Sequence, residues 1–190
     1  MKILAVAEQR DGSLKKVAGE VMRAAASLAS ELNGEAVGLV IGDQVKSIAG
    51  SLGRYGLKRV LVADDPALKM TSTTAYAHCI AEAALKEKAE VVLFSATAQG
   101  KDLAPRVAVK LHAGLVADCT ALNVEGGAII ASRPVYAGKA LTDVKVTSPN
   151  KVFTLRPNVF SAGAPEESTA AVEPLALSMS DGGIPAIFAT

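Results

Sequence analysis

The chain has 190 residues, of which 50% are hydrophobic and 21% are charged. Its 20 Lys and Arg residues nearly match its 19 Asp and Glu residues, so the formal net charge is +1. This balance argues against a nucleic-acid-binding protein, which needs a basic face, and against a disordered chain. Aromatic residues make up only 4% and Trp is absent. Small aliphatic side chains must therefore build the core, as is typical of helices packed on a parallel sheet.

We expect no membrane insertion, because no run approaches the roughly 20 apolar residues that a spanning helix needs. The first ten residues, MKILAVAEQR, become charged too soon for a signal peptide. The sequence therefore predicts a cytoplasmic protein, or one of the mitochondrial matrix if the source is a eukaryote. Cys79 and Cys119 lie far apart and outside any Cys/His cluster. They predict two reduced, buried thiols and not a metal site.

The first 125 residues alternate between apolar runs and stretches of helical periodicity. The apolar runs predict strands at 2–7, 36–41, 59–63 and 90–95. Such alternation implies an α/β fold, with a doubly wound, mostly parallel sheet and helices on both faces. In such a sheet, ligands or partners bind at the carboxyl ends of the strands.

Helical spacing predicts four helices between and after these strands. The first follows Ser13 as N-cap, with Val21 and Leu28 on its apolar stripe and Glu20 off that stripe. The fourth is expected at 103–112, with Asp102 as N-cap. The remaining two are predicted at 45–54 and 73–88.

A different pattern begins near residue 126. Two β-like runs, 128–136 and 139–147, meet at Ala137-Gly138 and predict a hairpin. Another short strand is expected at 151–155. We therefore predict one α/β domain over 1–160 that includes an antiparallel hairpin extension. The C-terminal segment 161–190 holds one possible strand at 171–177.

The sequence lacks the usual phosphate-binding and catalytic motifs. It has no GxxxxGK[ST] loop, no GxGxxG after the first strand and no GxSxG elbow. The first loop, 8–12, carries two acids and one glycine, which is a poor cradle for a pyrophosphate. The loop that opens the fourth helix, 95–106, is rich in small and hydroxyl residues. It could admit an anion, but a plain turn is the simpler interpretation, and Arg106 could pair with Asp102.

Several ordered segments resemble the alpha subunit of electron transfer flavoproteins. Gly100–Arg106 (GKDLAPR), followed by Gly114–Thr120 (GLVADCT), is similar to a GRDLAPR…GLxADCT-like run of that family. The later segments Arg133–Lys139 (RPVYAGK) and Leu155–Phe160 (LRPNVF) follow in the family's order. The resemblance covers roughly residues 1 to 180. Its departures include Lys101 in place of the usual Arg and Lys139 in place of a common Asn.

The resemblance implies an adenine-nucleotide-hydrolase-like fold and a role in electron transport. In that family this N-terminal domain packs against a beta subunit to form a heterodimer. The complex carries electrons from dehydrogenases through FAD to a membrane quinone oxidoreductase or another acceptor. Most FAD contacts belong to a second domain, toward which 161–190 would lead, and AMP or a second FAD can lie in the partner subunit. The chain is therefore expected to be a scaffold and electron-carrier subunit, not a catalyst by itself.

The resemblance places Arg133 and Lys139, in the hairpin, near the groove between the subunits. A guanidinium there could stabilise an anionic reduced flavin or a phosphate, and an interface salt bridge is the plainer alternative. No catalytic or metal-binding residue is predicted. Two other functions stay open from the sequence: a small nucleotide-binding domain of the universal-stress type, and an assembly module without a ligand.

Overall fold

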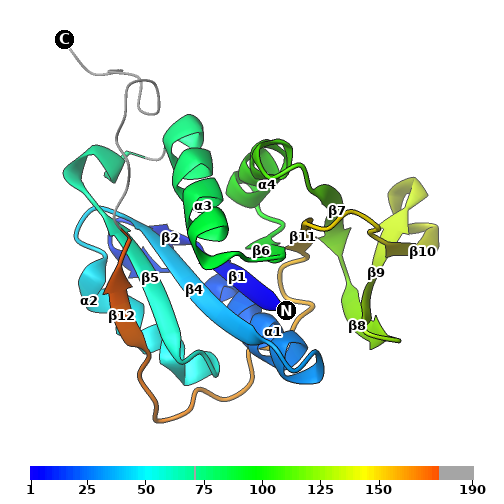
Figure 1. Ribbon diagram of the computed structural model, residues 1–190, viewed down its shortest axis with the longest axis horizontal. Helices are drawn as coiled ribbons and strands as arrows, with labels where there is room; N and C mark the ends of the chain where they lie inside the picture. The colour runs from blue at the N-terminus through cyan, green and yellow to red at the C-terminus, as the bar shows by residue number, and fades with distance from the viewer. Residues whose placement is uncertain (71, 176–190) are drawn as a thin grey trace.

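A computed structural model describes residues 1–70 and 72–175. Its main feature is a seven-stranded sheet in the order β12-β5-β4-β1-β6-β11-β7, in which neighbouring strands pair in parallel (Figure 1). This confirms the predicted parallel sheet. Its strands are β1 (Lys2–Ala7), β4 (Glu35–Gly42), β5 (Arg59–Asp64), β6 (Val91–Ser95), β7 (Gly114–Cys119), β11 (Lys151–Leu155) and β12 (Ala171–Pro174).

Helices cover both faces of this sheet, as the sequence predicts. In Figure 1, α1 (Lys16–Glu31) lies on one face, and α3 (Thr73–Glu87) and α4 (Ala98–Lys110) lie on the other. The predicted helix over 45–54 is a four-residue α2 (Lys46–Ala49) that tightens into the 3-10 helix η1 (Gly50–Tyr55). A further 3-10 turn, η2 (Pro66–Leu68), follows β5.

The central strand β1 separates two hydrophobic cores, because its side chains alternate between the faces of the sheet. Ile3 packs in the core that contains Val21 of α1. Leu4 packs in the core that contains Ile80 of α3 and Leu103 of α4. All five side chains are at most 3% exposed. The sheet is therefore buried on both faces, which explains why its strands read as nearly continuous apolar runs.

A second, antiparallel sheet extends the molecule beyond β7 (Figure 1). It consists of β8 (Ala121–Glu125), β9 (Ala128–Val135) and β10 (Ala140–Lys145), in the order β10-β9-β8, with η3 (Tyr136–Gly138) at the tip of the β9–β10 hairpin. The predicted hairpin is confirmed. β8 pairs with β9 only as far as Ser132, so Pro134 has β10 alone beside it, opposite Leu141. Its missing N–H therefore breaks no ladder bond to β8.

Two predicted helix starts are wrong. Lys15, not Ser13, is the N-cap of α1, because residues 9–14 form a small hairpin in which β2 (Gln9–Arg10) pairs with β3 (Ser13–Leu14). The fourth helix begins at Ala98 after the N-cap Thr97, whose hydroxyl accepts a hydrogen bond from the Gly100 N–H at 3.1 Å. Asp102 lies inside this helix.

Other differences come from long-range packing. Strand 151–155 was expected near the hairpin, but it inserts into the large sheet between β6 and β7. The strands β7 and β8 have no clear sequence signal and were not predicted. Glu20, expected on the outer side of its helix, is only 5% exposed and accepts a hydrogen bond from the Asn158 N–H at 2.9 Å.

The segment after β11 crosses to the opposite edge of the sheet, where it supplies β12 beside β5. Arg23 of α1 holds this segment by donating to the Ala162 carbonyl at 3.1 Å and to Glu166 at 2.7 Å. Gly53 permits the close approach, because a Cβ there would lie 2.2 Å from the Ala170 nitrogen. Residues 176–190, including the end of the strand expected over 171–177, lie outside the described residues. That 161–190 leads toward an FAD domain stays a prediction.

An ionic network ties strands β1, β4, β5 and β12 to α3 at the amino ends of the strands. Arg59 donates to Glu173 at 2.9 Å, to Glu35 at 2.9 Å and to Glu87 at 3.3 Å, and Lys2 donates to Glu87 at 2.9 Å. The hydrogen bond from Arg59 lowers the pKa of Glu35 and of Glu173. Burial opposes ionisation of Glu87, but Lys2 and Arg59 outweigh it and its pKa is also lowered.

Val21→Asp tests the packing of α1. Val21 is 1% exposed, so the substitution buries an unpaired carboxylate at a cost of several kcal/mol, out of a total stability of about 5–15 kcal/mol. We expect a large loss of thermal stability or failure to fold. Ser27→Asp is the matched control, because Ser27 lies on the exposed side of the same helix. If both variants melted within a few degrees of the parent, the assigned face of α1 would be wrong.

Arg59→Gln tests the ionic network through its pH dependence. The three carboxyl pKa values are lower in the folded chain than their ordinary value of 4.5. Their ion pairs therefore stabilise the fold above that value, and the contribution is lost as pH falls below it. We expect Arg59→Gln to lower the urea midpoint near pH 7, with the deficit shrinking near pH 3. Arg10→Gln removes an exposed ion pair with Asp11 and should show no such trend.

Candidate functional site: a closed crevice and a cationic hairpin

The topology directs attention to the carboxyl ends of β1 and β6. From β1 the chain first builds β4 and β5 on one side, then crosses to build β6 on the other. Ligands of doubly wound folds bind at such a switch point. A cavity with about 360 Å³ of empty space, including its opening to solvent, lies there. Its walls are mostly apolar and come from Val6, Ile41, Tyr76, Phe94 and Leu103.

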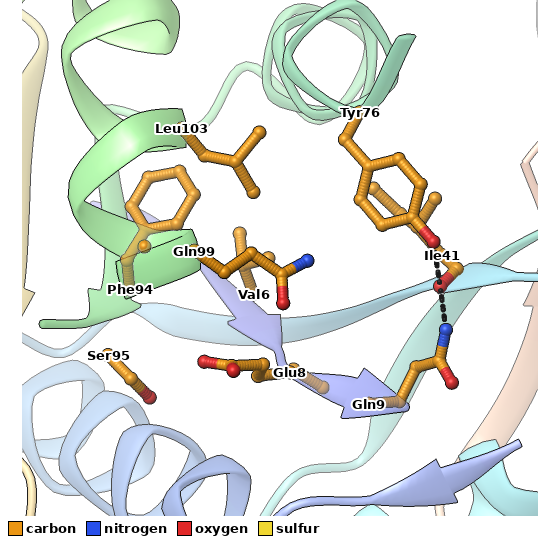
Figure 2. Close-up of a pocket in the computed structure, with 11 residues that line it drawn as sticks. Val6, Glu8, Gln9, Ile41, Tyr76, Phe94, Ser95, Gln99 and Leu103 are labelled. Carbon is orange, nitrogen blue, oxygen red and sulfur yellow. Dashed lines mark hydrogen bonds between the residues drawn. The ribbon is translucent and has the colours of Figure 1, made fainter. Parts of the chain in front are cut away.

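Figure 2 shows Glu8 crossing the floor of this crevice beneath Gln99, with its carboxylate directed toward Ser95. The Glu8 side chain is only 7% exposed. One carboxylate oxygen accepts from the Thr97 hydroxyl at 2.6 Å and the other from Lys15 Nζ at 2.5 Å. Thr97 is the N-cap of α4. A buried carboxylate therefore already lies beside the helix start that would otherwise attract an anion.

The opposite side of the crevice is also held together by hydrogen bonds. Gln9 points away from Glu8 and donates to the Ile41 carbonyl at 3.0 Å, which also accepts from the Tyr76 hydroxyl at 3.4 Å (Figure 2). The Gln9 side-chain oxygen accepts from the Gly12 N–H at 3.1 Å. These bonds fix the loop after β1 against β4 and α3.

A second polar arrangement lies at the carboxyl ends of β7 and β11. Arg156 donates twice to Asp118, at 3.0 Å and 2.6 Å, and the Asp118 N–H donates to the Thr154 hydroxyl at 2.8 Å. Asp118 has a φ of 64° where the β7–β11 register shifts. The bidentate pair therefore closes a local bulge. In the same way, Arg106 pairs with Asp102 at 3.4 Å, which fulfils that expectation from the sequence.

Arg133 lies on β9 opposite Thr142 and is half-buried. Its Nε is fully buried and has no hydrogen-bond partner among the described residues. Lys139, by contrast, is exposed just beyond η3, before the Val135–Ala140 pair at the tip of the hairpin. The structure thus puts both sequence-predicted site residues on one hairpin, but in different surroundings. A cofactor role for either one stays a prediction.

Positive charge gathers around Asp118. The hydrogen bond from Arg156 lowers the pKa of Asp118 against the effect of burial, and the charges of Lys101 and Arg133 lower it further. Burial raises the pKa of the neighbouring Cys119 thiol to about 12, although the charge of Arg133 acts the other way. Burial likewise raises the pKa of Cys79 to about 11. Both thiols stay protonated near neutral pH and are poor nucleophiles.

Neither a metal centre nor a membrane span is found in the part of the chain that the structure describes. Within 1–70 and 72–175, no three His, Cys, Asp or Glu side chains gather where they could hold a metal ion. None of the helices in these ranges is both long and apolar enough to cross a bilayer.

The fold and these sites define a doubly wound α/β domain with an antiparallel extension at one sheet edge. Residues 3–179 match the family model of the electron transfer flavoprotein domain, and the chain belongs to this family. It is 36% identical to electron transfer flavoprotein subunit alpha of Bacillus subtilis over 181 residues, which is 95% of this chain and 55% of the relative. It is 39% identical to the alpha subunit of Megasphaera elsdenii, over 83% of this chain and 48% of the relative.

A third relative is the acryloyl-CoA reductase electron transfer subunit beta of Anaerotignum propionicum. It is 43% identical over 118 residues, which cover 62% of this chain and 32% of the relative. The chain thus spans about half the length, or less, of these relatives. The resemblance to the alpha-subunit family, stated from the sequence, is confirmed.

The family binds FAD, and the described residues fit only a contact to its periphery. In the crevice, Glu8 holds the position beside α4 where a phosphate would bind, so the site is not suited to a dinucleotide. At the hairpin, the unpartnered Nε of Arg133 offers a donor to an anionic group. Arg133 is therefore the residue that could meet a flavin or phosphate held elsewhere in the complex.

Sequence reasoning missed the polar residues that organise these sites. Glu8 and Thr97 were seen only as parts of loops, and Asp118 and Arg156 only as parts of family segments. One signal was present: Glu8 is an acid directly after a strand that is apolar on both faces. A carboxylate at such a position is forced to find donors.

Proposed function

We propose that this chain is the N-terminal scaffold part of an electron transfer flavoprotein alpha subunit. It pairs with a beta subunit and shapes the electron-carrying site without catalysing a reaction itself. In this proposal dehydrogenases donate the electrons, a quinone oxidoreductase or another acceptor receives them, and FAD supplies the redox chemistry. The observation that carries it is the extension, which presents exposed apolar side chains and an unpartnered arginine nitrogen beyond the sheet.

The exposed apolar side chains support a protein partner at the hairpin. Tyr136 is 81% exposed and Leu141 is 72% exposed, and both belong to the β9–η3–β10 hairpin. Large apolar groups that gather at one end of a molecule mark an interaction surface. The relative from Anaerotignum propionicum, by its name, works as one subunit of an electron transfer assembly, which agrees with a partnered role.

Arg133 is the residue on this surface with a role in electron transfer. Its guanidinium carries a permanent charge and has one buried donor without a partner. When the subunits meet, that donor can bind an anionic reduced flavin or a phosphate at the groove. Lys139 adds a second, more exposed cation nearby. The alternative within the same complex is a salt bridge to a partner carboxylate.

The nucleotide-binding alternative receives one supporting observation, the crevice at the switch point. The buried Glu8 carboxylate weighs against it, because the start of α4 is already paired with an anion. Absorbance spectra of the complex separate the possibilities. A yellow flavin complex supports the electron-transfer role, retained AMP or ATP alone supports the alternative, and neither supports an assembly module without a ligand.

Arg133→Ala tests the electrostatic role. Removing a positive charge near a flavin destabilises the reduced anion, so we expect the potential to fall, on the order of tens of millivolts. Redox titration of the reconstituted two-subunit protein measures the shift. Arg133→Lys keeps the charge and should restore most of the potential, which a purely structural role would not explain. Unchanged potential, subunit affinity and nucleotide affinity in Arg133→Ala would reduce Arg133 to an ordinary surface residue.

Leu141→Asp tests the partner surface. An exposed carboxylate costs little in the free chain but would be buried at the interface. We therefore expect an unchanged melting temperature and at least tenfold weaker binding of the beta subunit, or about 1.4 kcal/mol. Val109→Asp is the matched control, because Val109 is 76% exposed on α4, away from the hairpin. Equal binding by both variants and the parent would remove the hairpin from the interface.

A further inference from the structure

The start of α4 has the properties of an anion-binding position. The helix has 13 residues and begins at the switch point, beside the carboxyl ends of β1 and β6. Helix starts carry partial positive charge, and their first N–H groups lack partners within the helix. Thr97 adds a hydroxyl, and Lys15 brings an ammonium from the start of α1. A hydroxyl, an ammonium and a helix start together form a donor set that suits a phosphate.

The protein's own Glu8 fills this position. Its carboxylate accepts from Thr97 at 2.6 Å and from Lys15 at 2.5 Å, and only 7% of the side chain is exposed. The Thr97 hydroxyl in turn accepts from the Gly100 N–H at 3.1 Å. The carboxylate is thus linked through one hydroxyl to the backbone of the first turn of α4. The buried polar group that points to the position is therefore already on the page, as an internal ligand.

Two further contacts keep the carboxylate there. The Lys15 N–H donates to the Glu8 carbonyl at 2.9 Å, so the loop between β1 and α1 is closed at its base. On the other side, a Cβ on Gly100 would lie only 1.8 Å from the Ser95 carbonyl oxygen. The first turn of α4 is therefore packed directly against the end of β6. Neither wall can retreat far enough to admit a phosphate beside the carboxylate.

We propose that Glu8 is the built-in occupant of an anion site, and that it closes the switch-point crevice to ligands that carry a phosphate. Removal of the carboxylate, without refilling its space, opens a site in which Lys15 and Thr97 bind a phosphate oxyanion. The inference is independent of the proposed function, because it concerns the chain without its partner.

Glu8→Ala and Glu8→Gln test the proposal in the whole chain, with inorganic phosphate as the probe. Alanine empties the site, whereas glutamine removes the charge but keeps the space filled. We expect phosphate, at tenfold its dissociation constant, to raise the melting temperature of Glu8→Ala by about 3 °C beyond a chloride control of equal ionic strength. The parent and Glu8→Gln should show only the small general stabilisation that phosphate gives to most proteins.

The double variant Glu8→Ala with Lys15→Met identifies the binding group. It should lose the phosphate effect, because the ammonium that replaces the paired carboxylate interaction is gone. A shift in Glu8→Ala that persists in the double variant, an equal shift in the parent, or no shift in Glu8→Ala would each overturn the proposal. Should Glu8→Ala unfold in chloride buffer, recovery of folded protein on refolding with phosphate supports the proposal. Failure to recover with phosphate overturns it.

Discussion

The requirement that both faces of the parallel sheet be covered decides the rest of this structure. A sheet with β1 at its centre sends alternate side chains, such as Ile3 and Leu4, into two separate cores. One core needs α1 and the other needs α3 and α4, so the helices have little freedom to do anything else. What remains for function is found at the strand ends and at the two edges. One edge is covered by β12, and the other continues into the antiparallel extension.

The two free regions have been used differently. At the switch point, where doubly wound folds bind their ligands, a carboxylate of the chain satisfies the start of α4. At the edge beyond β7, apolar side chains stay exposed on the hairpin and Arg133 keeps a buried donor unpaired. A buried donor without a partner costs free energy in the isolated chain, which a partner or ligand can recover. The cost therefore falls at the surface proposed to bind the beta subunit.

Local patterns predicted the elements that they control, and failed where distant contacts decide. The runs at 2–7 and 59–63 and the hairpin at Ala137-Gly138 follow from alternation and turn chemistry. The start of α1 does not, because the pairing of Gln9 with Leu14 overrides the capping preference of Ser13. Strand 151–155 was visible, but its place between β6 and β7 depends on chain crossing. Among site residues, Arg133 was identified through the family segment, whereas the role of Glu8 needed Thr97 and Lys15 in space.

The charges at the two ends of the strands suggest why one end is structural and the other functional. At the amino ends, Arg59 and Lys2 meet Glu35, Glu87 and Glu173, and each of these groups has a partner within the chain. At the carboxyl ends, Glu8 and Asp118 are paired too, but Lys101 and Arg133 add positive charge around Asp118 that the Asp118–Arg156 pair alone does not balance. An imbalance of charge in a low-dielectric setting attracts an external anion far more strongly than a balanced network does. The carboxyl end beside the hairpin is thus the part of this domain whose electrostatics are completed from outside the chain.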